Sequence, residues 1–294
     1  GLPKCSHPGD CYVWINEEMF EAAGLPVPEQ YGNTPEQLME WAAKLTKGPD
    51  SDREVYGYLP ATGHIMALYN PLRQFGGLEL SEDGSKSLAD SEEWFAWAQW
   101  TSKFYEDKLA PLPAAIPEGG PDALFAAGKL AMHHNQRYMN RRVKLAVEAA
   151  AKPFKWRVIQ FPRGSKARGW TACVDTHSAI ATSKHPEEAF LLSYAMADQR
   201  FTYLVARDIG YLGGRVDDKD SVKDLIAENP FLAVQYECMT QEEKFRQPTN
   251  ARGREVETVL KNEMDKVWLG QEKLTQDFMK RLKAAIDEVL AKPL

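Results

Sequence analysis

Short strand-like runs alternate with helical patterns along this chain, and the alternation leaves few folds open. The runs are rich in β-branched and aromatic residues and read CYVWIN, EVYGYLP, KLAMHH, KWRVIQFP and VDTHSAIATS. Strands separated by helices predict an α/β architecture. No fixed-period repeat or low-complexity linker divides the 294 residues, which suffice for two domains. We therefore expect interleaved domains, with the chain crossing between them more than once.

Three segments carry clear helix signals. Thr34 is a predicted N-cap, with Pro35 in the first helical position and Gln37 as the capping-box partner. Ser91 is the predicted cap of a second helix, and its aromatic residues between Trp94 and Tyr105 are expected in the core. The last segment repeats apolar residues at helical spacing, at Leu274, Phe278, Leu282, Ile286 and Val289.

The composition is that of a soluble globular protein, with 44% hydrophobic and 27% charged residues. The formal net charge is -6 and no long basic run occurs, so nucleic acid is not an expected partner. No apolar run approaches the roughly 20 residues that span a bilayer. The opening residues GLPKCSHPGDC do not have the basic start and apolar run of a signal peptide.

Four cysteines are too few for a disulfide scaffold. Cys5 and Cys11 bracket a short loop, and we predict a disulfide between them, which would imply an oxidising compartment. Unpaired thiols are one alternative. A metal site is another, with four candidate ligands in Cys5, His7, Asp10 and Cys11. Their spacing fits no standard zinc pattern, so we expect no bound metal.

The short motifs that carry catalytic or cofactor chemistry do not occur. The sequence has no GxGxxG, P-loop, HExxH or GxSxG. His133 and His134 are adjacent in a predicted strand, so their side chains should point to opposite faces and cannot easily bind one metal. The acidic pairs lie in first turns or on exposed faces of predicted helices. We expect neither an enzyme nor a cofactor.

Polar and aromatic residues gather where loops follow predicted strands and helices. Flat rings suit the C–H face of a sugar, and amide, guanidinium and hydroxyl groups suit its hydroxyls. This mixture favours a neutral polyol as ligand. The residues are His64, Tyr69, Asn135, Gln136, Arg137, Tyr138, Trp170, Thr171, Tyr211 and Arg215.

The order of several segments resembles that of a known family. The segments are YVWINEEMFEAAGLPVP, TPEQLMEWAAKLT, FGG, LFAAGKLAM, AIATSKHPEEAFLLSYAMADQ and VWLGQEKLTQDFMKRLKAAIDEVL. Each is weakly specific, but their order from about Tyr12 to Leu290 is similar to that of the extracellular solute-binding proteins of ABC sugar importers (family 1), the class of the maltose-binding protein.

The resemblance implies a periplasmic-binding-protein-like fold of type II, with two interleaved α/β lobes that close on a ligand by a hinge motion. It implies a substrate-binding component of an ABC transporter that captures a mono- or oligosaccharide for sugar transport. The expected partner is a membrane permease. We expect a monomeric, secreted protein, periplasmic or extracellular, anchored to a membrane as a lipoprotein, without a cofactor.

The same resemblance assigns ligand-binding residues. Tyr138 matches an aromatic residue that stacks on the sugar, and Asn135 matches a neighbouring polar contact. His64 and Tyr69 precede the double glycine, where the family often has an aromatic contact. Trp170 and Thr171 lie where the chain should cross between lobes. Tyr211 and Arg215 match a G-x-L-P-x-R loop, in which Gly213 replaces the usual proline. Arg252 precedes a helix that contributes to the cleft.

The resemblance also divides the chain. The second lobe is expected to be complete and to comprise residues 12–168 and 228–294. Residues 169–227 are expected to return to the first lobe, and residues 1–11 to form a loop that leads in. Family members have a long stretch before the YVWIN strand, whereas eleven residues precede it here. We therefore expect an incomplete first lobe.

Three other functions stay open at this point. An anionic sugar or sugar phosphate would be bound by arginines, with candidates in Arg137, Arg141, Arg142 and Arg215. A glycoside-active enzyme would need two carboxylates about 5–10 Å apart across the cleft. A structural scaffold would be favoured if the cleft held no aromatic residues.

Overall fold

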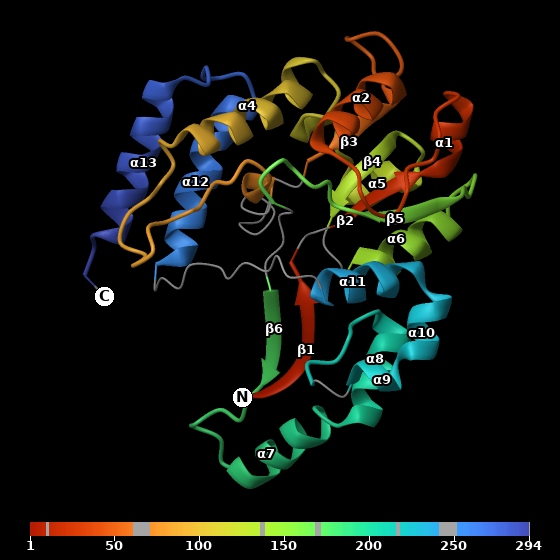
Figure 1. Ribbon diagram of the computed structural model, residues 1–294, viewed down its shortest axis with the longest axis vertical. Helices are drawn as coiled ribbons and strands as arrows, with labels where there is room; N and C mark the ends of the chain where they lie inside the picture. The colour runs from red at the N-terminus through yellow and green to blue at the C-terminus, as the bar shows by residue number, and fades with distance from the viewer. Residues whose placement is uncertain are drawn as a thin grey trace.

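The computed structural model describes residues 1–9, 12–60, 71–135, 139–167, 172–215, 218–240 and 252–293. Figure 1 shows two parts joined by long strands. The larger part contains a four-stranded sheet and several long helices. The smaller part contains a two-stranded sheet and the helices α7 to α10. Both parts combine strands with helices, as the sequence predicted, and the chain passes between them.

The elements follow one another in an irregular alternation. The strands are β1 Leu2–Pro8, β2 Tyr12–Asn16, β3 Tyr56–Leu59, β4 Leu130–Asn135, β5 Trp156–Gln160 and β6 Ala172–His177. The helices are α1 Glu17–Ala22, α2 Pro35–Leu45, α4 Glu92–Glu106, η1 Pro113–Ala115, α5 Gly120–Ala126, α6 Met139–Glu148, α7 Pro186–Ala195, α8 Gln199–Ile209, α9 Asp218–Ser221, α10 Lys223–Glu228, α11 Pro230–Thr240, α12 Gly253–Trp268 and α13 Gln276–Leu290.

The larger sheet has the strand order β3-β4-β2-β5. β3 and β4 run parallel, while β2 pairs antiparallel with both β4 and β5. β2 is therefore a central strand, and its whole YVWIN sequence is buried. A strand that is buried at every position, rather than at every second one, is typical of a sheet covered on both faces.

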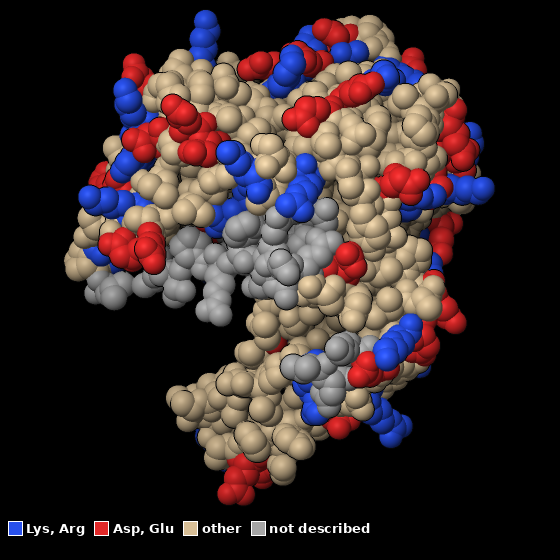
Figure 2. Space-filling view, viewed as in Figure 1, with Lys and Arg blue, Asp and Glu red and all other residues tan. Residues whose placement is uncertain are grey.

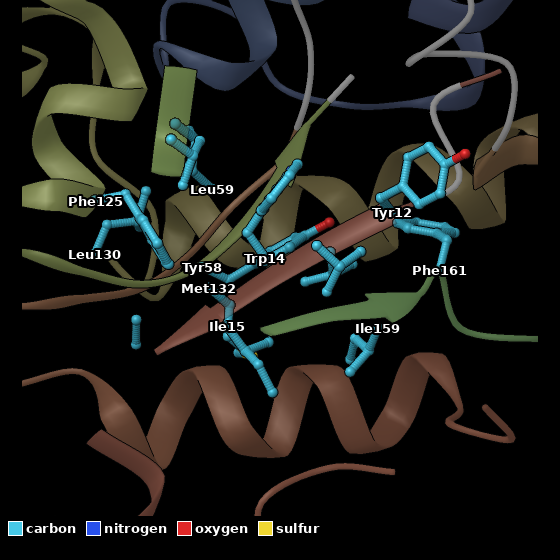
Figure 3. Close-up of a cluster of buried hydrophobic side chains, with 14 of the residues drawn as sticks. Tyr12, Trp14, Ile15, Tyr58, Leu59, Phe125, Leu130, Met132, Ile159 and Phe161 are labelled. Atoms are coloured by element: carbon cyan, nitrogen blue, oxygen red, sulfur yellow. The ribbon is translucent and has the colours of Figure 1, made fainter. Parts of the chain in front are cut away.

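The side chains of β2 alternate between two apolar layers. Tyr12 and Trp14 point to one side of the sheet and Ile15 and Ile159 to the other (Figure 3). On the first side, Phe231 of α11 packs with its ring centroid 5.1 Å from that of Tyr12 and 5.8 Å from that of Trp14. These contacts bring α11 onto the sheet although it lies more than two hundred residues further along the chain.

The predicted helix caps are confirmed. The Thr34 side chain accepts a hydrogen bond from the Gln37 amide, and the Gln37 side chain accepts one from the Thr34 amide. The Ser91 side chain accepts a hydrogen bond from the Trp94 amide at the start of α4. Such caps satisfy amide groups that a helix start would otherwise leave without partners.

A second apolar cluster joins α4, α12 and α13. The Trp97 ring lies 5.3 Å from that of Trp94 and 6.2 Å from that of Trp268, both at nearly right angles. All three tryptophans are at most 5% exposed. The aromatic residues of α4 therefore serve mainly as core, as the sequence predicted, and they attach the closing helices to the larger part.

The opening residues differ from the expectation. Residues 1–11 were expected to form a loop, but Leu2–Pro8 form β1 and pair antiparallel with β6. The run VDTHSAIATS is strand only as far as His177. β1 has a proline and polar residues in its sequence, and its partner is about 170 residues away, so no local pattern reveals it.

Candidate functional site

One end of the larger sheet lies where the chain passes to the smaller sheet. Tyr12, at the start of β2, is in register with Asn135 at the end of β4 and with Gln160 at the end of β5. β1 ends just before this row, and β6 follows β5 along the chain. This row of residues therefore lies next to the connections between the two parts.

Figure 2 shows a wide notch on the same side of the molecule. In the matching view of Figure 1, the notch lies between α12 in the larger part and α7 in the smaller part, beside β6. A hollow between two parts, next to the strands that join them, is where an interlobe ligand would be expected. We take this region as the candidate site.

The adjacent histidines of β4 lie in the core behind this end of the sheet. The His134 ring stacks on that of Phe161 with centroids 4.3 Å apart. His133 is 5% exposed, and burial, with a smaller contribution from the charge of His134, lowers its pKa to about 3. His133 is therefore neutral at physiological pH. Both rings are packing groups rather than surface ligands.

The loop after α8 approaches the crossing strand β1. The Ser6 amide donates a hydrogen bond of 3.2 Å to the carbonyl of Leu212, and Cys5 forms a backbone bridge with Gly213. This loop holds two of the residues predicted to bind ligand. Tyr211 is partly buried and Arg215 is exposed.

Two buried polar side chains that lie outside this loop form hydrogen bonds with its backbone. The Gln235 side chain, on α11, accepts a hydrogen bond of 2.9 Å from the Leu212 amide and donates one of 3.4 Å to the Gly210 carbonyl. The Asp218 carboxylate accepts a hydrogen bond of 3.0 Å from the Arg215 amide. Neither residue is more than 2% exposed. Neither residue is predictable from the sequence, because nothing local indicates that a glutamine in an apolar helix holds a distant loop.

The close approach also explains the glycines of the loop. A Cβ atom on Gly213 would lie 2.0 Å from the Asp218 carboxylate, and one on Gly214 would lie 2.9 Å from the Pro3 side chain. The G-x-L-P-x-R motif has proline at the position of Gly213. Glycine at this position lets the Asp218 carboxylate approach the loop closely.

His64, Tyr69, Tyr138, Trp170 and Thr171 lie outside the described residues. Asn135 is described only as the last residue of β4, in register with Tyr12. Of the predicted set, only Tyr211 and Arg215 are described together on one loop. The rest stay predictions.

Arg252 has extensive contacts at the end of the chain. Its guanidinium donates to the carbonyls of Lys292 and Pro293 and to the Glu255 carboxylate. The side chain thus ties the C-terminal residues to the first turn of α12. These contacts occupy much of its hydrogen-bonding capacity, so a ligand would have to compete for it.

The predicted Cys5–Cys11 disulfide cannot be placed either, because Cys11 lies outside the described residues. Cys5 is buried in β1, and its Sγ lies at hydrogen-bonding distance, 3.1 Å, from the Asp175 carboxylate of β6. The His7 Nε2 atom lies 3.6 Å from the other oxygen of the same carboxylate. Within the described ranges, no group of three or more residues has the arrangement of a metal site.

The buried carboxylates of the described part each have a structural partner. Glu79 accepts a hydrogen bond from Arg73, although burial raises the pKa of Glu79. Asp122 lies 3.6 Å from the Arg142 guanidinium. Asp218 holds the loop already described. Each of the three thus has a structural role, and none of these contacts pairs it with a second carboxylate.

Two other pockets lie among the described residues. One, of about 480 Å³, is bounded by β5, α6, α8, α10 and α11. Its cations Lys144, Arg157 and Arg207 lie 3.8, 2.8 and 2.6 Å from carboxylates. The other, of about 500 Å³, lies at the ends of α4 and α12 beside the stacked rings of Tyr105 and Trp268. Neither is lined by a residue that the sequence predicted to bind ligand.

Comparison with known proteins assigns the family. The model of the family described as bacterial extracellular solute-binding protein matches residues 12–198. The chain belongs to this family. No curated protein matches the chain. The family match confirms the resemblance inferred from the order of the segments, and it makes this chain a solute-binding protein of a class that works outside the cell.

Solved structures share the fold. A Listeria monocytogenes ABC substrate-binding protein in complex with cycloalternan has a TM-score of 0.81 and 19% identity, over 100% of this chain and 72% of its own. A Thermotoga lettingae solute-binding protein bound to α-D-tagatose has a TM-score of 0.79 and 20% identity, over 99% and 72%. A Bdellovibrio bacteriovorus maltose/maltodextrin-binding domain bound to maltotriose has a TM-score of 0.76 and 19% identity, over 99% and 72%.

These similarities confirm the type II periplasmic-binding-protein fold predicted from the sequence. In the described part of the chain, no helix has both the length and the apolar character needed to cross a membrane.

Proposed function

We propose that this solute-binding protein captures a neutral mono- or oligosaccharide and delivers it to an ABC importer. The observation that carries the proposal is the family match over residues 12–198. The three structures above support it, because each has the same fold and holds a sugar. The protein makes and breaks no bond in this role; it binds, closes and releases.

The candidate site supports a ligand between the two parts. The loop from Gly210 to Arg215 is fixed against β1 by the backbone contacts of Ser6 and Cys5. Tyr211 in this loop is partly buried, and Arg215 is exposed. A ring that covers a sugar face and a group that donates to hydroxyls are what a neutral polyol needs. We propose Tyr211 and Arg215 as ligand contacts, together with the predicted residues outside the described ranges.

The described arginines favour a neutral over an anionic ligand. Arg142 lies beside the buried Asp122, and Arg252 contacts Glu255 and the C-terminal carbonyls. An anionic sugar would need a cation aimed at the site with its charge still available. Arg215 is exposed on the candidate loop, but it is not without a partner in the protein.

We further propose that the parts close on the ligand by a hinge motion at the connections between them. The proposed division assigns residues 12–168 and 228–294 to one lobe and 169–227 to the other. A closed form that differs from the open form gives a permease something to recognise. The membrane permease as partner, a monomeric state and a lipoprotein anchor belong to this proposal.

A thermal-shift assay on the full-length protein tests the function. A ligand that binds only the folded state raises the melting temperature. We expect a shift with at least one of maltotriose, D-mannitol or D-tagatose, and none with glucose 6-phosphate. A shift with the phosphate alone would replace the neutral ligand by an anionic one. No shift with a broad panel of sugars would overturn the proposal.

A matched pair of variants tests the site. Tyr211→Ala should weaken binding of the sugar that gives the largest shift by about fivefold or more, since loss of an aromatic stacking contact is worth on the order of 1 kcal/mol or more. Tyr203→Ala is the control, because the Tyr203 hydroxyl binds Asp224 on α10, outside the loop. Equal affinities of the two variants for the sugar would show that Tyr211 does not contact it.

A further inference from the structure

One of the two pockets described above has a lining that the proposed function does not use. It lies at the ends of α4 and α12, and we name it the α4–α12 pocket. Four segments line it: the loop before β3, the end of α4, the residues around η1 and the end of α12. Its volume of about 500 Å³ falls within the range of about 300–1,000 Å³ that is usual for small-molecule sites.

The pocket lies at the opposite end of the larger sheet from the candidate site. Tyr56, which lines the pocket, begins β3 and is in register with Leu130 at the start of β4. The other end of β4, at Asn135, belongs to the row next to the connections between the parts. Figure 1 shows α4 on the side of the larger part that is turned away from the smaller part. A ligand in this pocket would therefore not lie between the parts.

Aromatic and aliphatic side chains form the apolar wall of the pocket. Tyr56 and Tyr105 are partly exposed. The Tyr105 ring is stacked on that of Trp268, with centroids 5.8 Å apart and an angle of 21° between the planes, and Trp268 is only 5% exposed. Leu112 and Leu269 are 44% and 40% exposed. A tyrosine ring that is stacked on a buried tryptophan has little freedom to move, and such a ring suits a ligand with a flat apolar face.

Charged side chains complete the lining without giving it a net charge. Asp50 accepts hydrogen bonds of 2.7 Å from the Arg53 guanidinium and 3.0 Å from the Lys108 ammonium group. The hydrogen bond from Lys108 lowers the pKa of Asp50, which is therefore ionised at neutral pH. Glu106 supplies a second, exposed carboxylate. Two cations and two carboxylates favour an uncharged ligand that both donates and accepts hydrogen bonds.

Lys108 has a backbone conformation that glycine adopts more easily. Its φ angle is 53°, and it is the only non-glycine residue with a positive φ in the part of the chain that the structure describes. It follows Asp107, the C-cap of α4, at the position where helices commonly have glycine. The ion pair with Asp50 is exposed, and such pairs add little stability, so it does not account for the strain. A role of the ammonium group in binding would account for it.

We propose that the α4–α12 pocket is a second binding site, specific for a neutral saccharide and separate from the site between the parts. Tyr105 and Tyr56 cover the C–H face of a sugar ring, while Lys108 donates to its hydroxyls and Glu106 accepts from them. The inference does not depend on the proposed function, because it is argued from the lining of this pocket alone.

Hydrogen exchange with mass spectrometry on the full-length protein tests the site, with maltose, maltotriose and D-tagatose as probes. We expect at least one of them to slow the exchange of amides in residues 105–115 and 267–270. Ala115→Trp places an indole in the lining and should abolish this effect. Ala149→Trp, at an exposed position after α6, is the control and should retain it. Sugar binding between the parts is read separately, from residues 210–215.

Lys108→Gly separates a binding role of Lys108 from a structural one. Glycine relieves the strained backbone, so this variant should melt about 1–2 °C higher than the unsubstituted protein. It should nevertheless bind the sugar about threefold or more weakly, because a hydrogen-bond donor is lost. Lys103→Ala is the control, since it removes an exposed ion pair with Asp107 on the same helix and outside the pocket. Its affinity for the sugar should be unchanged.

Three results would overturn the proposal. The first is unchanged exchange at this pocket with all three sugars. The second is an effect of the sugar that persists in both Ala115→Trp and Lys108→Gly. The third is slower exchange at this pocket with indole and with none of the sugars, which would assign the pocket to an aromatic ligand.

Discussion

Gly213 sets the distance between the candidate ligand loop and the carboxylate that holds it. A Cβ atom there would overlap the Asp218 carboxylate, which already accepts hydrogen bonds from the Arg215 amide and the Thr202 hydroxyl. We predict that Gly213→Ala lowers the free energy of unfolding by about 1–3 kcal/mol, because an overpacked site must shift backbone or lose those bonds. Urea unfolding measures the change.

A glycine in open space provides the control. Gly253, in the first turn of α12, has no atom within 4 Å of an added Cβ. Gly253→Ala should raise the free energy of unfolding by roughly 0.4–1 kcal/mol, since alanine restricts the unfolded chain. Equal effects of both substitutions would show that the Asp218 contact does not constrain the loop.

The buried His133 gives the protein a predictable sensitivity to acid. Its pKa is about 3 in the folded protein, below the usual value near 6.5. Between these values the unfolded chain binds a proton that the folded chain does not, so stability is complete above about pH 6.5 and falls as the pH falls toward 3. In His133→Met the slope of unfolding free energy against pH between pH 6 and 4 should be smaller by about 1.4 kcal/mol per pH unit.

The exposed His185 is the control for this titration, because its side chain is 76% exposed. His185→Gln should leave the slope close to that of the unsubstituted protein. An unchanged slope in His133→Met would mean that His133 is protonated in the folded protein.

At the scale of single residues, the sequence predicts what depends on near neighbours. The opposite orientation of His133 and His134 follows from strand geometry alone, and the cap at Thr34 follows from three nearby residues. The partners of Gln235 and Asp218 were not predictable. They depend on where α8 and α11 meet, which no spacing in the sequence contains.

At the scale of elements, α11 links the sheet core to the candidate loop. Phe231 packs on Tyr12 and Trp14, and one turn further Gln235 binds the loop. We predict that Gln235→Leu lowers the free energy of unfolding by about 1–3 kcal/mol, because it leaves the buried Leu212 amide without a partner. The Leu212 amide should also exchange faster than in the unsubstituted protein, which hydrogen exchange with mass spectrometry measures.

Gln30→Leu is the matched control for this substitution. The Gln30 side chain is partly exposed and donates a solvent-exposed hydrogen bond to the carbonyl of Pro230, also on α11. Its loss should cost no more than a few tenths of a kcal/mol. A Leu212 amide that exchanges at the same rate in Gln235→Leu would show that backbone contacts with Ser6 alone hold the loop.

Helices with local sequence signals were predicted correctly, whereas the strand β1, which has no such signal, was not predicted. α2 and α4 have caps, and α13 has regular apolar spacing. β1 was expected as a loop because its proline and polar residues do not alternate with apolar ones. It is a strand because β6 and the loop at Leu212 supply partners on both sides.

At the scale of the molecule, the order of weak motifs predicted the family although no single motif would have. The two-lobed fold follows from that order, since a chain that crosses between parts has a characteristic succession of strands and helices. The site follows less well. Five of its predicted residues lie outside the described ranges. Two of the described ones, Tyr211 and Arg215, lie on a loop held by the distant residues Gln235 and Asp218.

The central claim is that a neutral sugar binds between the two parts and brings them together. Small-angle X-ray scattering on the full-length protein, with and without the sugar that gives the largest thermal shift, tests it most directly. We predict a smaller radius of gyration with the sugar, and no change in Tyr211→Ala at the same sugar concentration. A sugar that raises the melting temperature without changing the radius of gyration would contradict closure between the parts.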